Sequence, residues 1–191
     1  MADLKQLAQD MIPDATFNDY LCTGIVLVLQ NAIGEESFLP RLLVLEAADE
    51  TNTHPASLLL LAFDGFNDPD IRHQALFHLG QQAYRNTIQP VAAFLLSEAW
   101  GRYFKTDEAC NLPLADYEDK VEVLLAMGLT LDKRAAHAYF PITRDDNNLI
   151  TSIGNPTLFP YGSTDTIDSP LVAQFFRGYL AALKKNQGTL S

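Results

Sequence analysis

Hydrophobic and polar positions along the chain predict helices at both ends and strands between them. The segment Thr16-Phe-Asn-Asp19 resembles a capping box with Asp in place of the usual Glu. Apolar residues follow it at helical spacing up to Ala32, and Gly34 is suited to end the helix. This helix is apolar on most of its circumference, so we expect it inside the domain or against a second subunit.

The next apolar segment predicts a second helix that starts near Ser37. Pro40 would lie in its first turn, where a missing N–H costs little. The helix must end before Pro55, because the residue preceding a proline is pushed away from the α region.

The middle of the chain has the pattern of a βαβ unit, in which a helix connects two strands. Ser57–Phe63 is a short apolar run that fits a buried strand, although such a run also fits a helix. Asn67-Asp68-Pro69 supplies an N-cap for a helix to about Asn86, and Pro90–Trp100 is the next apolar strand. Two strands joined by such a helix are normally parallel, with a right-handed crossover.

A hairpin is predicted next, with Val121–Leu131 and Arg134–Thr143 on either side of Asp132-Lys133. A two-residue turn there pairs Leu131 with Arg134, and a slip of one residue would mix the apolar and polar faces. The more polar face would carry Glu122, His137 and Tyr139.

The end of the chain predicts a turn, a loop and a helix. The turn at 145–148 leads into a short third strand, Leu149–Ile153, and residues 154–169 read as a long irregular loop. Ser169-Pro170 starts a terminal helix with one broad apolar stripe, and Lys184 and Lys185 suit its C-terminus.

Together these elements predict a single α+β domain over residues 1–191. A helical, acidic part (1–55) precedes a sheet-forming part (56–153), the long loop (154–169) and the terminal helix (170–186). The small mixed sheet would consist of one βαβ unit followed by the antiparallel hairpin. The amount of apolar helical surface exceeds what one small sheet can cover, so we expect a homo-oligomer.

Charge narrows the range of partners. The 191 residues carry a net charge of -11, and 48% of them are hydrophobic, which is typical of a globular chain. Residues 1–70 contain twelve acidic residues against two bases, Lys5 and Arg41. This balance argues against nucleic acid and against anionic membranes as partners. We interpret the acids as a solvated surface; the alternative is a negative face that mimics a phosphate backbone and meets a basic protein.

Cysteine usage and the N-terminus favour a cytoplasmic protein. Cys22 and Cys110 are too few for a disulfide framework, and Cys22 should behave as a small buried hydrophobe. The N-terminus has no basic region followed by an apolar one, and the longest apolar run is shorter than a membrane span.

Metal and cofactor motifs are absent from the sequence. Glu46, Glu50 and His54 have helical spacing, but Pro55 would force His54 out of a helix. His73 and His78 point away from each other on the predicted third helix. There is no HExxH motif, phosphate-binding loop or nucleophile elbow, so we expect no metal and no cofactor.

One group of residues could form a pocket. If the strands 90–100 and 121–131 are neighbours, two carboxylates could converge with a histidine or tyrosine nearby for proton transfer. The alternative is an ordinary solvated sheet face with charges at strand ends. The candidate residues are Ser97, Glu98, Trp100, Glu122, His137, Tyr139 and Arg144.

Three functional hypotheses follow. The first is a non-enzymatic interaction or regulatory domain that binds a protein partner or itself, because no catalytic motif is evident. The second is a small-molecule-binding protein or hydrolase with its site around Glu98, Glu122, His137, Tyr139 and Arg144. The third is an acidic nucleic-acid mimic that binds a basic protein.

Overall fold

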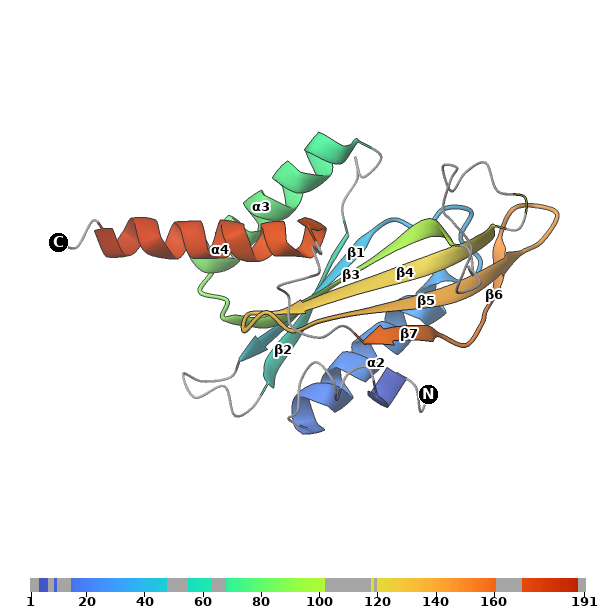
Figure 1. The fold of residues 1–191 in the computed structure, drawn as a ribbon, viewed down its shortest axis with the longest axis horizontal. Coiled ribbons are helices and arrows are strands. Elements are labelled where there is room, and N and C mark those ends of the chain that lie inside the picture. Colours follow the sequence, from blue (N-terminus) through green and yellow to red (C-terminus); the bar gives the residue numbers. More distant parts are fainter. Residues whose placement is uncertain are drawn as a thin grey trace, which may run out of the picture.

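A curled antiparallel sheet with helices on both faces makes up the computed structural model of the chain (Figure 1). The structure describes residues 4–6, 9, 15–47, 55–62, 68–101, 118, 120–160 and 170–188. The elements in these ranges are α2 (Ala15–Ala32), β1 (Arg41–Ala47), β2 (Pro55–Ala62), α3 (Pro69–Arg85), β3 (Pro90–Gly101), β4 (Val121–Thr130), β5 (Ala135–Arg144), β6 (Ile150–Ile153), β7 (Thr157–Pro160) and α4 (Pro170–Gly188).

The sheet separates two hydrophobic cores. Its strand order is β2-β1-β3-β4-β5-β6, and β7 pairs with β5 next to β6. Buried residues of α2, among them Ile25 and Val28, pack on one face of the sheet, which we call the α2 face. The helices α3 and α4 cover the other face, the α3–α4 face, with buried residues such as Leu76 and Phe175 (Figure 1). No helix in the described ranges is long and apolar enough to span a membrane.

The α+β fold class is confirmed, and so are the first, third and terminal predicted helices. The first predicted helix is α2, and Gly34 after it has a φ of 88°, a conformation that favours glycine. The predicted N-cap of the third helix is also present, because the Ile71 N–H donates to Asp68 Oδ1 over 3.3 Å and Pro69 begins α3. The terminal helix is α4.

The predicted second helix is wrong, because Arg41–Ala47 forms β1. Its four consecutive apolar residues point alternately into the two cores. Leu42 and Val44 are buried on the α3–α4 face, and Leu43 and Leu45 are buried on the α2 face. A strand buried on both faces is a continuous apolar run, whose periodicity cannot be distinguished from that of a buried helix.

The predicted βαβ unit is not formed as neighbouring strands. β2 and β3 both pair antiparallel with β1, so they run parallel to each other with β1 between them. Every described strand pair is antiparallel, in place of the mixed sheet that the sequence predicts. The prediction of a parallel pair is wrong because it treated the residues of β1 as a helix. Without β1 between them, β2 and β3 were expected to be direct neighbours.

The predicted hairpin is formed by β4 and β5. The predicted pairing of its strands differs from the observed pairing by one residue. Leu129 pairs with Ala135 across a loop of residues 131–133. The Thr130 N–H donates to the Arg134 carbonyl over 2.9 Å, and Lys133 adopts a φ of 68°. This is the geometry of a three-residue loop with one left-handed residue. The correction places Glu122 on the α2 face and moves His137 to the α3–α4 face, where it lies opposite Met127.

The segment after the hairpin is more regular than predicted. The predicted short third strand is present as β6, and residues 157–160 of the expected loop form β7, which pairs with residues 136–139 of β5. The rest of that loop, 161–169, lies outside the described residues.

Two glycines allow α3 and α4 to cross in direct backbone contact. A Cβ at Gly80 would overlap the Phe175 carbonyl oxygen, and a Cβ at Gly178 would overlap the Phe77 carbonyl oxygen. The contact is therefore reciprocal, with one glycine of each helix seated on the backbone of the other. Neither position can hold a side chain unless the helices move apart.

We predict that Gly80→Ala destabilises the protein by about 2 kcal/mol or more, because the added methyl group forces the helices apart. Helix propensity alone would give the opposite sign, since Ala is favoured over Gly inside a helix by about 1 kcal/mol. Urea unfolding measures the difference, with Gln74→Ala at an exposed position of α3 as the control. A stabilised Gly80→Ala variant would contradict the observed helix crossing.

Candidate functional site

Three residues of the predicted pocket lie together at one end of the sheet. Glu98 is near the end of β3, Glu122 near the start of β4 and Arg144 at the end of β5. Because these three strands are neighbours and antiparallel, the three positions fall at the same end. All three side chains are on the α2 face, beside the loop that connects α2 with β1.

Arg144 binds both carboxylates and three backbone carbonyls. Its Nε lies 3.0 Å from each carboxylate oxygen of Glu122, and its Nη2 donates to Glu98 Oε1 over 2.7 Å and to Glu122 Oε1 over 2.8 Å. Its Nη1 donates to the backbone carbonyls of Glu36 and Asn148 over 2.7 and 2.8 Å, with the carbonyl of Glu35 at 3.5 Å. All five N–H groups of the guanidinium therefore have acceptors. We call this arrangement the Arg144 clamp.

The electrostatics of the Arg144 clamp favour a fixed ion cluster. The Arg144 side chain is 11% exposed, and the two carboxylates are 26% and 24% exposed. The hydrogen bonds that Arg144 donates to the Glu122 carboxylate are the main cause that raises the pKa of Arg144 above its ordinary value. A guanidinium held this way keeps its charge at every physiological pH and neutralises one of the two carboxylates.

The Arg144 clamp fastens the loop after α2 to the sheet. Glu98 Oε1 also accepts the Phe38 N–H over 2.7 Å, so one carboxylate binds both the loop and the arginine. The backbone completes the attachment, because the Gly34 N–H donates to the Ile150 carbonyl over 2.8 Å and the Ile150 N–H to the Glu35 carbonyl over 3.0 Å. These contacts give Glu98 and Glu122 a positioning role within the fold.

The remaining residues of the predicted pocket lie elsewhere. Ser97 is buried on the α3–α4 face, since neighbouring residues of a strand point to opposite faces. His137 and Tyr139 are on that face too, and burial lowers the pKa of His137, which favours its neutral form. The Trp100 backbone pairs with Glu122, but its side chain lies outside the described part of the chain. No single pocket therefore contains the predicted residues whose side chains are described.

The other sequence candidates are dispersed. Glu46 is on β1 instead of a helix, while Glu50, His54 and Cys110 lie outside the described residues. Within the described ranges, no group of three His, Cys, Asp or Glu side chains is arranged to hold a metal ion. Cys22 is half-buried, and burial raises the pKa of its thiol, which disfavours the reactive thiolate.

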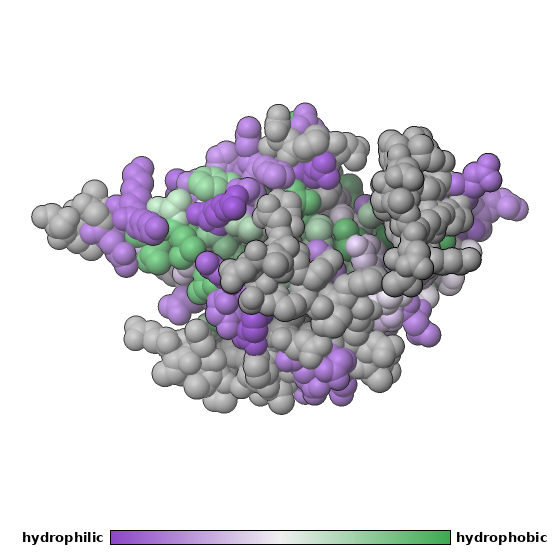
Figure 2. Space-filling view, in the orientation of Figure 1, coloured by the Kyte–Doolittle hydropathy of each residue, from purple (hydrophilic) through white to green (hydrophobic). Residues whose placement is uncertain are grey.

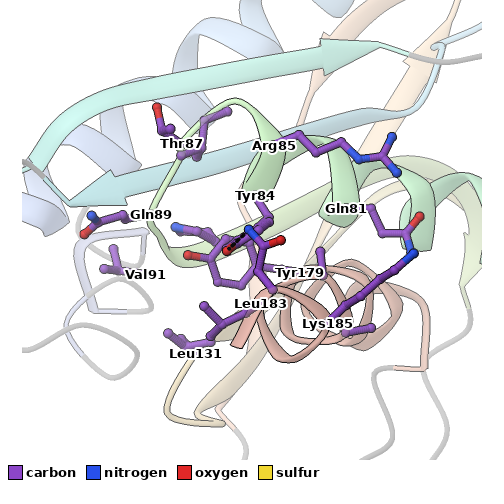
Figure 3. A pocket seen from close by; sticks show the side chains of 15 residues that line it. Gln81, Tyr84, Arg85, Thr87, Gln89, Val91, Leu131, Tyr179, Leu183 and Lys185 are labelled. Atoms are coloured by element: carbon purple, nitrogen blue, oxygen red, sulfur yellow. Dashed lines mark hydrogen bonds between the residues drawn. The ribbon is translucent and has the colours of Figure 1, made fainter. Parts of the chain in front are cut away.

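A surface groove of about 880 Å³ lies where α3 ends and α4 continues beyond the sheet (Figure 3). Figure 2 shows green apolar surface over this part of the molecule, with purple hydrophilic atoms around it. The groove, which we call the α4 groove, is lined by Gln81, Tyr84, Arg85, Thr87, Ile88, Gln89, Pro90, Val91, Leu131, Tyr179, Ala181, Ala182, Leu183, Lys185 and Asn186.

Two tyrosines join the helices inside the α4 groove. The rings of Tyr84 and Tyr179 meet edge to face with their centres 5.8 Å apart, and Asn186 Nδ2 donates to the Tyr84 hydroxyl over 3.0 Å. Burial raises the pKa of Tyr179, which keeps its phenol protonated at neutral pH. Both rings are half-buried, so each presents one edge to the groove.

The end of α3 forms one rim of the α4 groove through a Schellman motif. The Ile88 N–H donates to the Ala83 carbonyl over 3.0 Å and the Thr87 N–H to the Tyr84 carbonyl over 3.1 Å. Thr87 adopts a φ of 60°, in the left-handed region where a β-branched residue is strained. Strain of this kind concentrates at functional surfaces.

Sequence reasoning missed the α4 groove because its residues come from two helices, one strand and one turn. The available signal was local and weak: Leu131 is an apolar residue inside a turn, and Thr87 follows a helix where glycine or asparagine is usual.

The chain was compared with protein-family models, curated proteins and solved structures. No family model matches the chain, and neither a curated protein nor a solved structure matches it.

We predict that Arg144→Met destabilises the protein by about 3 kcal/mol, because it leaves two neighbouring carboxylates without their counter-charge. The matched control is Arg134→Met, which removes an arginine bound to the exposed Asp132 and should cost less than about 1 kcal/mol. Urea unfolding at pH 7 measures both variants. Equal effects would contradict the structural role of the Arg144 clamp.

We predict that Thr87→Gly stabilises the protein by about 0.5–1 kcal/mol, because glycine adopts a positive φ without steric cost. The control is Asn86→Gly, at an exposed neighbouring position without a positive φ, where glycine should destabilise. Urea midpoints of the two variants should move in opposite directions. A loss of stability in Thr87→Gly would show that Thr87 is not strained.

Proposed function

We propose that this protein is a non-enzymatic interaction or regulatory domain that binds a protein partner through the α4 groove. The observation that carries the proposal is the groove itself, which is open, has a volume of about 880 Å³ and is built on two helices in fixed contact. A rigid support and a surface that mixes apolar and polar groups are typical of protein-binding sites.

The placement of the predicted pocket residues supports a non-enzymatic role. A paired-carboxylate mechanism needs one carboxyl group that can take up or release a proton near the substrate. Glu98 and Glu122 instead bind Arg144, and the proposed proton-transfer partners His137 and Tyr139 lie across the sheet. The hydrolase hypothesis therefore has no geometry in its favour.

The hypothesis of an acidic nucleic-acid mimic has less support than the hypothesis of partner binding through the α4 groove. Five of the twelve acidic residues of 1–70 have described side chains: Asp19, Glu35, Glu36, Glu46 and Asp68. They lie on α2, on the loop after it, at the end of β1 and before α3, so no single element carries them. The acids that would complete such a row are outside the described part.

The proposal predicts that the tagged chain, expressed at its native level, elutes from gel filtration of its own cell extract well above 21.2 kDa. Chemical cross-linking before lysis should join it to a defined protein or to a second copy. The same purified protein should show no turnover in a panel of ester, phosphoester and glycoside substrates. Elution near 21.2 kDa with and without cross-linking would contradict the proposal.

The Glu122→Gln variant separates the two functional classes in that panel. Any turnover that this variant abolishes, while its urea midpoint shows that it remains folded, would establish an enzyme and overturn the non-enzymatic proposal. Turnover that persists in the variant at the same level does not depend on Glu122.

A further inference from the structure

The α4 groove is basic on an otherwise acidic chain. Its charged lining residues are Arg85 at the end of α3 and Lys185 in the last turn of α4, and no acidic residue of the described ranges lines it. Both bases are exposed, and they lie on the same side of the groove in Figure 3. On a chain with a net charge of -11, this placement puts two positive charges on one side of the groove.

Apolar side chains are on the opposite side of the groove, next to the polar Thr87 and Gln89. Val91 and Leu131 lie there in Figure 3, with Leu183 of α4 between them and the tyrosines. The Leu131 N–H donates to the Val91 carbonyl over 2.9 Å, so the turn that carries Leu131 is fixed to β3. Leu131 is nevertheless 40% exposed, which leaves an apolar side chain available at the rim.

The backbone at the end of α3 does not require Arg85 as a cap. The carbonyls of Ala83 and Tyr84 already accept hydrogen bonds from Ile88 and Thr87. An exposed guanidinium beside satisfied carbonyls is suited to bind a carboxylate from another molecule, with bidentate geometry. The amides of Gln81 and Gln89 add donors and acceptors for a peptide backbone.

We propose that the α4 groove binds an acidic peptide segment of a partner protein, with its carboxylates on Arg85 and Lys185 and an apolar anchor against Val91, Leu131 and Leu183. The inference rests on the proposed interaction function and names the chemistry of the partner. Charge complementarity selects acidic segments, and the mixed, open lining favours a peptide over a small molecule, whose sites are more enclosed and more apolar.

The test is selection of a phage-displayed library of random twelve-residue peptides on the immobilised wild-type protein. The recovered sequences are expected to be rich in Asp and Glu next to one or two large apolar residues. One recovered peptide is then measured by fluorescence anisotropy with wild type and variants. Arg85→Glu combined with Lys185→Glu should weaken binding at least about tenfold, because it removes the charge contacts to the peptide. Leu131→Ser should weaken binding by a similar factor, because it removes the apolar contact.

Lys184→Glu is the matched control for charge. It makes the same change on the adjacent residue of α4, which is exposed but does not line the groove. Binding in this variant should stay within about twofold of wild type, since a charge that does not line the groove acts on the peptide mainly through long-range steering. Urea midpoints of the variants should lie together, which excludes unfolding as the cause of lost binding.

Each other outcome overturns the inference. Recovery of basic or uncharged peptides, equal loss of binding in Lys184→Glu, or no enrichment over an empty support would each show that the groove does not bind acidic segments. A small molecule that native mass spectrometry finds on the wild type and not on Arg85→Glu/Lys185→Glu would assign the groove to a small ligand. A stable protein complex that survives these groove variants would leave the interaction function standing and refute this site for it.

Discussion

The burial of β1 and β3 on both faces is the constraint on which the rest of the structure depends. Leu42 to Leu45 of β1 and Ala92 to Leu96 of β3 are buried almost completely, and their side chains alternate between two cores. A sheet with such central strands must be covered on both sides. This is why α2 occupies one face and the α3–α4 pair the other, although antiparallel sheets often leave one face to solvent.

The Arg144 clamp and the α4 groove are consequences of this two-sided arrangement. On the α2 face, the sheet needs a polar end where strands meet the loop after α2, and one arginine satisfies two carboxylates and three carbonyls there. On the other face, α4 extends past the end of the sheet that it covers, so its last turns project with the end of α3 (Figure 1). The polar groups of the Arg144 clamp bind one another, whereas those of the α4 groove are at the surface.

The glycine crossing explains how a projecting surface can still be rigid. Gly80 and Gly178 bring the two helix backbones together, and Tyr84 and Tyr179 continue the contact toward the groove. Close backbone packing limits sliding between the helices, because each carbonyl fits a site where only hydrogen atoms are available. The spacing between Arg85 and Lys185 is therefore set by the core of the helix pair, and a partner would meet a preformed surface.

The sequence by itself determined the elements whose signals are local. Capping at Asp68, the turn at 145–148, the apolar stripe of α4 and the existence of a hairpin after residue 120 are all encoded within a few neighbouring positions. Tertiary structure alone decided that residues 41–47 form a strand. An apolar run of this length is compatible with a buried helix or a buried strand, and only its packing between the two cores distinguishes them. It also decided the hairpin register, through the left-handed Lys133, and thereby divided Glu122 from His137. The partners of Arg144 and the α4 groove belong to this second class, since backbone carbonyls and surfaces shared by distant segments leave no pattern in the sequence.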